Sequence, residues 1–164
     1  MDQLIVLLKM SSVDKVIRIS EREGLCSVSN NTKWRGLLSE IQGLQTNKRI
    51  KWIDNEEPTA WQVGMWQPTP TYVEASGGPE QLKFVEWIEI SRTEQRYVGR
   101  LVDPESIDHT ETILQVLGCS GMNFDELDDS FRIFGYTRPE SNRKRAEQAV
   151  PPKSDRAGGQ LIDR

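Results

Sequence analysis

Apolar residues between positions 31 and 44 recur every three or four residues, the spacing of one face of a helix. Asn31 or Thr32 stands where an N-terminal cap is needed, because both side chains can accept a backbone hydrogen bond. The pattern therefore predicts an amphipathic helix that buries one apolar stripe, made of Trp34, Leu37, Leu38, Ile41 and Leu44.

Four later segments alternate apolar and polar residues with the period of a half-buried strand. They are residues 49–54, 61–66, 84–90 and 131–136, and a short strand is also expected at 72–74. A second helix is predicted from Asp103 to Gly118, because a cap residue, a proline at the first helical position and an early Glu105 follow one another. The acidic stretch 123–130 is expected to be a loop.

This order of elements predicts an α+β fold, with a small, mostly antiparallel sheet and two helices packed on one face. We expect the α+β domain to span residues 31–137. Residues 1–30 are interpreted as a partly ordered N-terminal extension. Residues 138–164 are polar, rich in Pro and Gly, and predicted to be a disordered basic tail.

The charge is unevenly distributed along the 164 residues, whose formal net charge is −4. Residues 31–137 carry 17 acids and 10 bases, whereas residues 138–164 carry seven bases and four acids. An acidic body repels phosphate backbones, which disfavours duplex nucleic acid as a partner of the folded part, and a basic protein surface suits it better.

The sequence gives little support for a metal site or a catalytic nucleophile, because the chain has only two cysteines and one histidine. Cys26, Cys119 and His109 are too scattered for a zinc site. His109 and Cys119 are ten positions apart on the predicted helix, too far for a catalytic pair, so His109 is interpreted as a solvated side chain. Gly77 and Gly78 lack the Lys-Ser/Thr of a phosphate loop. No metal and no cofactor are expected.

The cysteine usage favours a reducing cytoplasm. The apolar run at residues 4–8 is too short for a secretory signal, and no run approaches the length of a membrane helix. A cytoplasmic location is therefore expected.

Glu86 and Glu89 stand on an otherwise apolar strand. In a regular strand Glu86 would share a face with Ile88, and Glu89 would share the other face with Val85 and Trp87. The two carboxylates would then point to opposite faces, which excludes a glycosidase-like pair. An internal ion pair or a contact with a partner is the better interpretation.

A partner-binding surface is the remaining hypothesis. Interface hot spots favour tryptophan, and fixed carboxylates attract a basic partner. Bases interleaved with the tryptophans would favour stacking on nucleic acid, but none lies near Trp61 and Trp66 in sequence. The candidate residues are Asp54, Glu56, Glu57, Trp61, Trp66, Asp125, Glu126, Asp128 and Asp129.

Three motifs resemble an uncharacterised bacterial family that is known only as a domain of unknown function. They are T-K-W at residues 32–34, W-I-E-I at 87–90 and R-I-F-G-Y at 132–136. Small acidic α+β domains of this sort resemble immunity proteins, and the resemblance implies a cognate toxin as partner. The alternatives are a small carboxylate-dependent enzyme acting on a nucleotide or sugar, with Asp54 and Glu86 converging, and a regulatory protein that binds nucleic acid through its tail.

Overall fold

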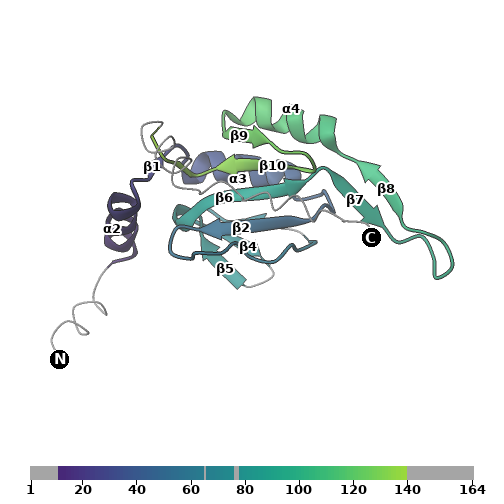
Figure 1. The fold of residues 1–164 in the computed structure, drawn as a ribbon, viewed down its shortest axis with the longest axis horizontal. Coiled ribbons are helices and arrows are strands. Elements are labelled where there is room, and N and C mark those ends of the chain that lie inside the picture. The colour runs from purple at the N-terminus through teal and green to yellow at the C-terminus, as the bar shows by residue number, and fades with distance from the viewer. Residues whose placement is uncertain (1–10, 65, 76–77, 140–164) are drawn as a thin grey trace, which may run out of the picture.

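The computed structural model describes residues 11–64, 66–75 and 78–139. The described part contains helices and strands in mixed order, followed along the chain in Figure 1. The helices are α2 (Ser12–Glu23), α3 (Asn31–Ile41), α4 (Thr110–Ser120) and the short 3-10 helix η1 (Leu82–Phe84). The strands are β1 (Cys26–Ser27), β2 (Lys48–Trp52), β3 (Gln67–Pro68), β4 (Tyr72–Ala75), β5 (Gly78–Gln81), β6 (Val85–Ser91), β7 (Thr93–Arg96), β8 (Glu105–Asp108), β9 (Asn123–Glu126), β10 (Ser130–Phe134) and β11 (Tyr136–Thr137).

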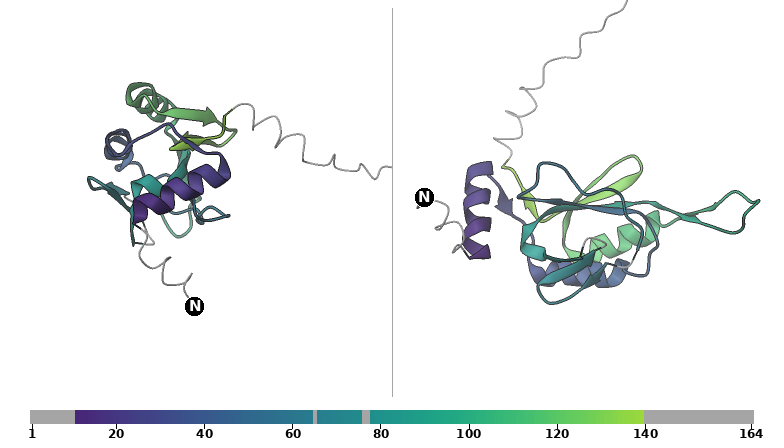
Figure 2. Two further views of the ribbon diagram at one scale, coloured as in Figure 1. Left: turned by 90° about the vertical axis from the view of Figure 1, so that its left-hand side faces the viewer. Right: turned by 90° about the horizontal axis from the view of Figure 1, so that it is seen from below.

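The central sheet has four antiparallel strands in the order β2-β6-β10-β9. Ile50, Ile88 and Ile133 lie opposite one another across three of them and are at most 1% exposed. Helices α3 and α4 lie on the same side of this sheet in both views (Figures 1 and 2). The predicted α+β class is therefore confirmed.

Helix α3 carries the apolar stripe that its sequence predicts. Trp34, Leu37, Leu38 and Ile41 are all buried and belong to the main core. The cap is Asn30 rather than Asn31 or Thr32, because the Asn30 side chain accepts a hydrogen bond from the Lys33 backbone at 2.9 Å.

Helix α2 forms inside the predicted N-terminal extension. Ser11 and Asp14 make a reciprocal capping box at its start, and Gly24 ends it in the left-handed conformation, with φ 63°. Ile19 and Leu25 pack with Ile53 and Tyr136 in a small second cluster. Residues 4–8 and the basic segment from residue 140 onward lie outside the described residues.

The second helix begins later than predicted. Residues 105–108 form β8 and pair with β7, and α4 starts at Thr110. The prediction of a helix start at Asp103 was wrong, because cross-strand pairing of Glu105–Asp108 overrides the local capping pattern. Asp108 supplies the cap bond instead, since its carboxylate accepts from the Thr110 backbone at 2.8 Å.

Two other segments also differ from the prediction. The acidic stretch expected as a loop contains β9, an edge strand paired with β10 and packed through Phe124, whose ring meets Phe131 edge-on at 6.3 Å. The strand expected at 61–66 is reduced to one bridge between Lys48 and Gln62. Gly64, at φ 141°, interrupts the extended backbone there.

Strand β6 contains a bulge that changes the side on which its carboxylates lie. Lys51 pairs with Trp87 and Trp52 pairs with Val85, so Glu86 is an extra residue. Val85 joins the core, whereas Glu86 receives a hydrogen bond from Lys51 on the outer face. The prediction that Glu86 and Glu89 point to opposite faces was therefore wrong, because the strand is not regular.

Gly135 makes the close approach of β10 and β6 possible. A Cβ atom at this position would lie 2.2 Å from the Val85 carbonyl oxygen. The Gly135 amide instead donates to the Glu86 carbonyl at 2.8 Å, beside the bulge.

Candidate functional site

A two-stranded hairpin projects from the body of the molecule (Figures 1 and 2). It consists of β7 and β8, which pair from Thr93 opposite Asp108 to Arg96 opposite Glu105, and of the loop 97–104. β7 follows directly on β6, so the hairpin leaves the central sheet at one end. The segment is long enough to place its tip away from every helix of the described part.

The tip of the hairpin is apolar and exposed. Tyr97 is 70% exposed, Val98 50%, Leu101 98% and Val102 61%. Single exposed apolar residues are ordinary on protein surfaces, but four large ones within six positions at the end of a projection form a patch. Most of the apolar surface of this patch stays in contact with water.

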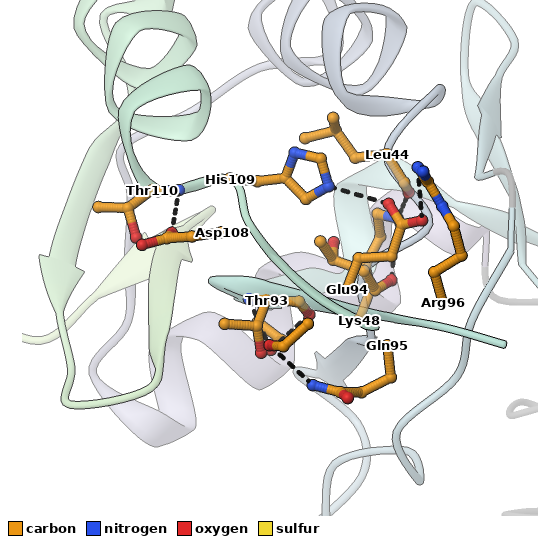
Figure 3. Close-up of polar contacts among 12 residues, drawn as sticks. Leu44, Lys48, Thr93, Glu94, Gln95, Arg96, Asp108, His109 and Thr110 are labelled. Carbon is orange, nitrogen blue, oxygen red and sulfur yellow. Dashed lines mark hydrogen bonds and ion pairs between the residues drawn. The ribbon is translucent and has the colours of Figure 1, made fainter. Parts of the chain in front are cut away.

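The root of the hairpin is polar and closed, as Figure 3 shows. The Glu94 carboxylate lies 2.9 Å from Nε2 of His109 and 3.5 Å from the Arg96 guanidinium. The hydrogen bond from His109 and the nearby positive charge of Arg96 hold the pKa of Glu94 below its usual range. His109 is not the solvated side chain expected from the sequence, because its side chain is only 18% exposed.

Lys48 is completely buried next to this pair. Its ammonium group donates to the carbonyl oxygens of Leu44 at 2.6 Å, Thr46 at 3.2 Å and Gly64 at 3.5 Å. Burial lowers the pKa of Lys48 to about 8, and the attraction of Glu94 offsets part of this effect. With its three donors engaged, Lys48 is a structural cation that ties separate loops together rather than an available nucleophile.

Arg92 joins the hairpin root to the other edge of the sheet. Its guanidinium donates to Glu126 at 2.8 Å and to the Leu127 carbonyl at 2.7 Å. Its own carbonyl accepts from the His109 amide at 2.8 Å. Asp108 caps α4 at the same place, and its hydrogen bonds to Thr110 lower its pKa. The root is thus fixed to the body from several directions.

Comparison with known protein families identifies the family of this chain. A family of unknown function (DUF6678) matches residues 16–140, most of the chain. The chain belongs to this family. No curated protein and no solved structure matched it. The prediction of a family of unknown function is confirmed, whereas the three motifs that suggested it stay a prediction. The family match takes in both the hairpin and most of α2.

Within the family domain, the predicted acidic residues form two patches rather than one. Asp54, Glu56 and Glu57 follow β2, whereas the residues of the second patch lie on β9 and in the following turn. The strand order puts β2 and β9 at opposite edges of the sheet, about 14 Å apart at the usual strand spacing. The second patch consists of Asp125, Glu126, Asp128 and Asp129.

Some of these carboxylates have partners within the chain. Asp54 pairs with Lys15 at 2.8 Å, and Glu126 pairs with Arg92 at 2.8 Å. The Asp54–Lys15 pair is exposed and contributes little stability, whereas Arg92 is only 20% exposed and its pair with Glu126 belongs to the hairpin root.

The two predicted tryptophan anchors have opposite environments. Trp61 is 42% exposed, with the Arg49 guanidinium 4.5 Å from its ring centre. Trp66 is only 1% exposed and belongs to the main core. The prediction of Trp66 as a surface anchor was wrong, because the irregular segment before β3 turns its ring inward.

The hairpin was not singled out in the sequence, although a signal was present. Tyr97, Val98, Leu101 and Val102 surround Gly99 and Arg100, an apolar set interrupted by a turn. The Asp103-Pro104 pair drew attention to a helix start instead. Polar strands with only partly buried residues do not show the alternation that identifies a hairpin.

The remaining chemistry of the described residues is limited. Among residues 11–64, 66–75 and 78–139, no group of three His, Cys, Asp or Glu side chains is arranged to hold a metal ion. No helix in the described part is both long and apolar enough to cross a membrane. A groove of about 980 Å³ lies between α2 and the end of β2, away from the hairpin.

Proposed function

We propose that the chain is a non-enzymatic protein-binding domain whose hairpin tip enters a partner. In the biological form that we favour, it is a bacterial immunity protein acting in the cytoplasm. The tip would occlude the active site of a cognate toxin. The observation that carries the proposal is the exposed apolar tip of the projecting hairpin.

Burial of the tip by a partner would supply binding energy. Fully burying a Val or Leu side chain contributes about 1.5–3 kcal/mol before the costs of association. A few central residues usually dominate the affinity of an interface. Leu101 and Val102 are suited to this role because they are 98% and 61% exposed.

The closed root supports the same proposal. The hydrogen bond between Glu94 and His109 holds the base of the hairpin, and the buried ammonium group of Lys48 attracts Glu94. A binding element that is ordered before association loses less conformational entropy on binding. A rigid wedge is the shape needed to fill a cleft.

The charge of the body would assist association with a basic partner. The acidic patches at the two sheet edges would steer a cationic surface towards the domain and raise the association rate more than the final affinity. This effect should weaken at higher ionic strength.

The enzyme alternative has less support from the described residues. A catalytic acid needs a carboxyl whose pKa is raised, as in a desolvated cleft. Instead, the pKa values of Glu94 and Asp108 are lowered by their hydrogen bonds. Asp54 and Glu86, named above as a converging pair, are bound to different lysines, Lys15 and Lys51.

The test uses the product of the adjacent gene as the partner. We expect the two full-length proteins to co-purify and the activity of the partner to be lost in the complex. Replacing Leu101 and Val102 by Ser should raise the Kd, measured by titration calorimetry, about a hundredfold.

A control removes two other exposed apolar side chains, away from the hairpin. Val13 and Ile17 on α2 are 54% and 49% exposed, so replacing both by Ser should leave the Kd unchanged. The proposal fails if the partner is bound as tightly without Leu101 and Val102, or if no complex with the adjacent product forms.

A further inference from the structure

The outer face of the central sheet is built differently from its core face. Arg49 on β2, Glu89 on β6 and Arg132 on β10 lie opposite one another across it. Trp87 occupies the next outward position along β6. Helices α3 and α4 lie on the other side of the sheet, so no described helix covers this face (Figure 2).

Four planar side chains alternate over this outer face. The Arg49 guanidinium lies 4.5 Å from the ring centre of Trp61 and 5.8 Å from that of Trp87. The Arg132 guanidinium lies 4.5 Å from the ring centre of Trp87. Stacked guanidinium and indole groups attract one another and hold each other's planes in place.

Glu89 fixes both arginines from below. Its carboxylate accepts from Arg49 at 3.1 Å, Arg132 at 3.0 Å and the Ser130 hydroxyl at 2.8 Å. Burial alone would raise the pKa of Glu89, but these hydrogen bonds outweigh it and keep the pKa below its ordinary value. The carboxylate therefore remains charged and the arginines remain oriented.

Glu89 lies beneath the two arginines, and Asp125, opposite Arg132 on the edge strand β9, is an exposed acid of this face. The Glu89 side chain is 4% exposed, whereas those of Arg49 and Arg132 are 27% and 32% exposed. A second set repeats the arrangement: Glu86 is 12% exposed beneath Arg138, which is 43% exposed at 3.8 Å. Between β2 and β10, a ligand approaching from solvent thus meets cations and aromatic rings first.

Arg138 also begins the most basic part of the sequence. Residues 138–164 contain seven bases and four acids, with Arg143, Lys144 and Arg145 consecutive. Arg138, the first residue of this segment, lies beside Glu86 on the outer face of the sheet. The net charge of the whole chain hides this concentration of positive charge.

We propose that the outer face, formed by Trp61, Arg49, Trp87 and Arg132, binds single-stranded nucleic acid. Bases would stack on the exposed ring of Trp61 and on the guanidinium planes, and phosphates would lie near Arg138. Single strands are recognised in this way on aromatic and arginine planes with nearby positive charge.

The acidic sheet edges favour one strand over a duplex. Asp54, Glu56 and Glu57 follow the end of β2, and Asp125 lies on the edge strand β9 opposite Arg132. A duplex would bring its second row of phosphates towards these carboxylates, where repulsion opposes binding. A single strand can follow the face between them.

The test measures fluorescence anisotropy of labelled single-stranded RNA and DNA oligonucleotides, and of a duplex, with the full-length chain. We expect saturable binding of single strands at low salt, weaker binding of duplex and quenching of tryptophan fluorescence. Trp61→Ala should weaken single-strand binding about tenfold and Trp61→Phe much less, because stacking is lost only in the first. Arg138→Gln should reduce the salt slope by about one.

Tyr97→Ala is the matched control, since it removes another exposed aromatic ring, at the hairpin tip. It should leave nucleic acid binding unchanged.

Absence of saturable single-strand binding would overturn the proposal. The proposal would also fail if duplex and single strand bound with equal affinity and Trp61→Ala did not change that affinity. Such a result would indicate nonspecific attraction to the tail. Loss of a protein partner's binding in Trp61→Ala, without any nucleic acid binding, would assign the face to a protein instead. None of these outcomes depends on the hairpin proposal, which is tested by different variants.

Discussion

The two ends of the β7–β8 hairpin differ in almost every physical respect. At the root, Glu94, His109 and Lys48 are buried or nearly buried and each polar group described above has a partner within the chain. At the tip, Leu101 and Val102 are apolar and open to solvent. The contacts at the root stabilise the fold, whereas the exposed side chains at the tip add little to its stability. The difference separates the part of the hairpin that holds position from the part that is free to bind.

Removing the buried cation should have the largest effect on stability. Lys48→Met keeps most of the side-chain volume but leaves three carbonyl oxygens without their donor. We expect the free energy of unfolding at neutral pH to fall by about 3 kcal/mol, measured by urea denaturation.

Lys15→Met is the matched control for this variant. The Lys15 side chain is 53% exposed and pairs only with Asp54 at the surface. Its replacement should cost about 0.5 kcal/mol. Equal losses in the two variants would show that the root does not depend on Lys48.

The lowered pKa of Lys48 predicts that stability rises in mild alkali. The pKa of Lys48 is about 8 in the folded chain, whereas its ordinary value is 10.5. Between these two pH values the unfolded state therefore binds more protons than the folded state. The free energy of unfolding should therefore increase by about 2 kcal/mol from pH 8 to about 9.5. Burial raises the pKa of Tyr136, which acts in the opposite direction near pH 10 and limits the window.

The comparison that isolates this effect is the same pH series on Lys48→Met. The variant lacks the titrating group, so its stability should not rise over this range. A parallel rise in both proteins would assign the effect to another group.

Replacing Glu94 by Gln should loosen the hairpin while the rest of the domain keeps its order. The charged acceptor of His109 and Arg96 is lost, so amide hydrogen exchange in β7 and β8 should become faster. The stabilisation by Glu94 exists above about pH 4.5 and disappears as the pH falls through its lowered folded pKa. Unchanged exchange in both strands would mean that other contacts fix the root.

The smallest effect on stability is expected at the tip. Leu101 is 98% exposed, so Leu101→Ser should change the free energy of unfolding by less than about 0.5 kcal/mol. A loss above about 2 kcal/mol in urea denaturation would show that the tip packs on the chain itself, which would remove the contrast with the root.

The sequence predicted those elements whose local pattern and tertiary environment agree. The stripe of α3 was visible because Trp34, Leu37 and Ile41 repeat at helical spacing and are all buried. The pairing of β8 with β7 was not visible, because Asp103 and Pro104 satisfy a helix start locally and only a distant strand decides otherwise.

The candidate sites were harder to predict than the fold, because they are formed by contacts between segments that are distant in the sequence. The stacking of Arg49 on Trp61 joins residues twelve positions apart and no local pattern indicates it. The bulge at Glu86 reverses the parity on which the faces of β6 were assigned. Exposed apolar residues at a hairpin tip have no periodicity by which to recognise them.

Hydrogen exchange of the full-length chain with and without the adjacent gene product tests the central claim most directly. We predict that amides of residues 97–102 exchange rapidly in the free protein and become protected in the complex, while β7 and β8 at the root change little. Protection confined to other surfaces, with the tip exchanging as rapidly as before, would contradict the assignment of the hairpin as the binding element.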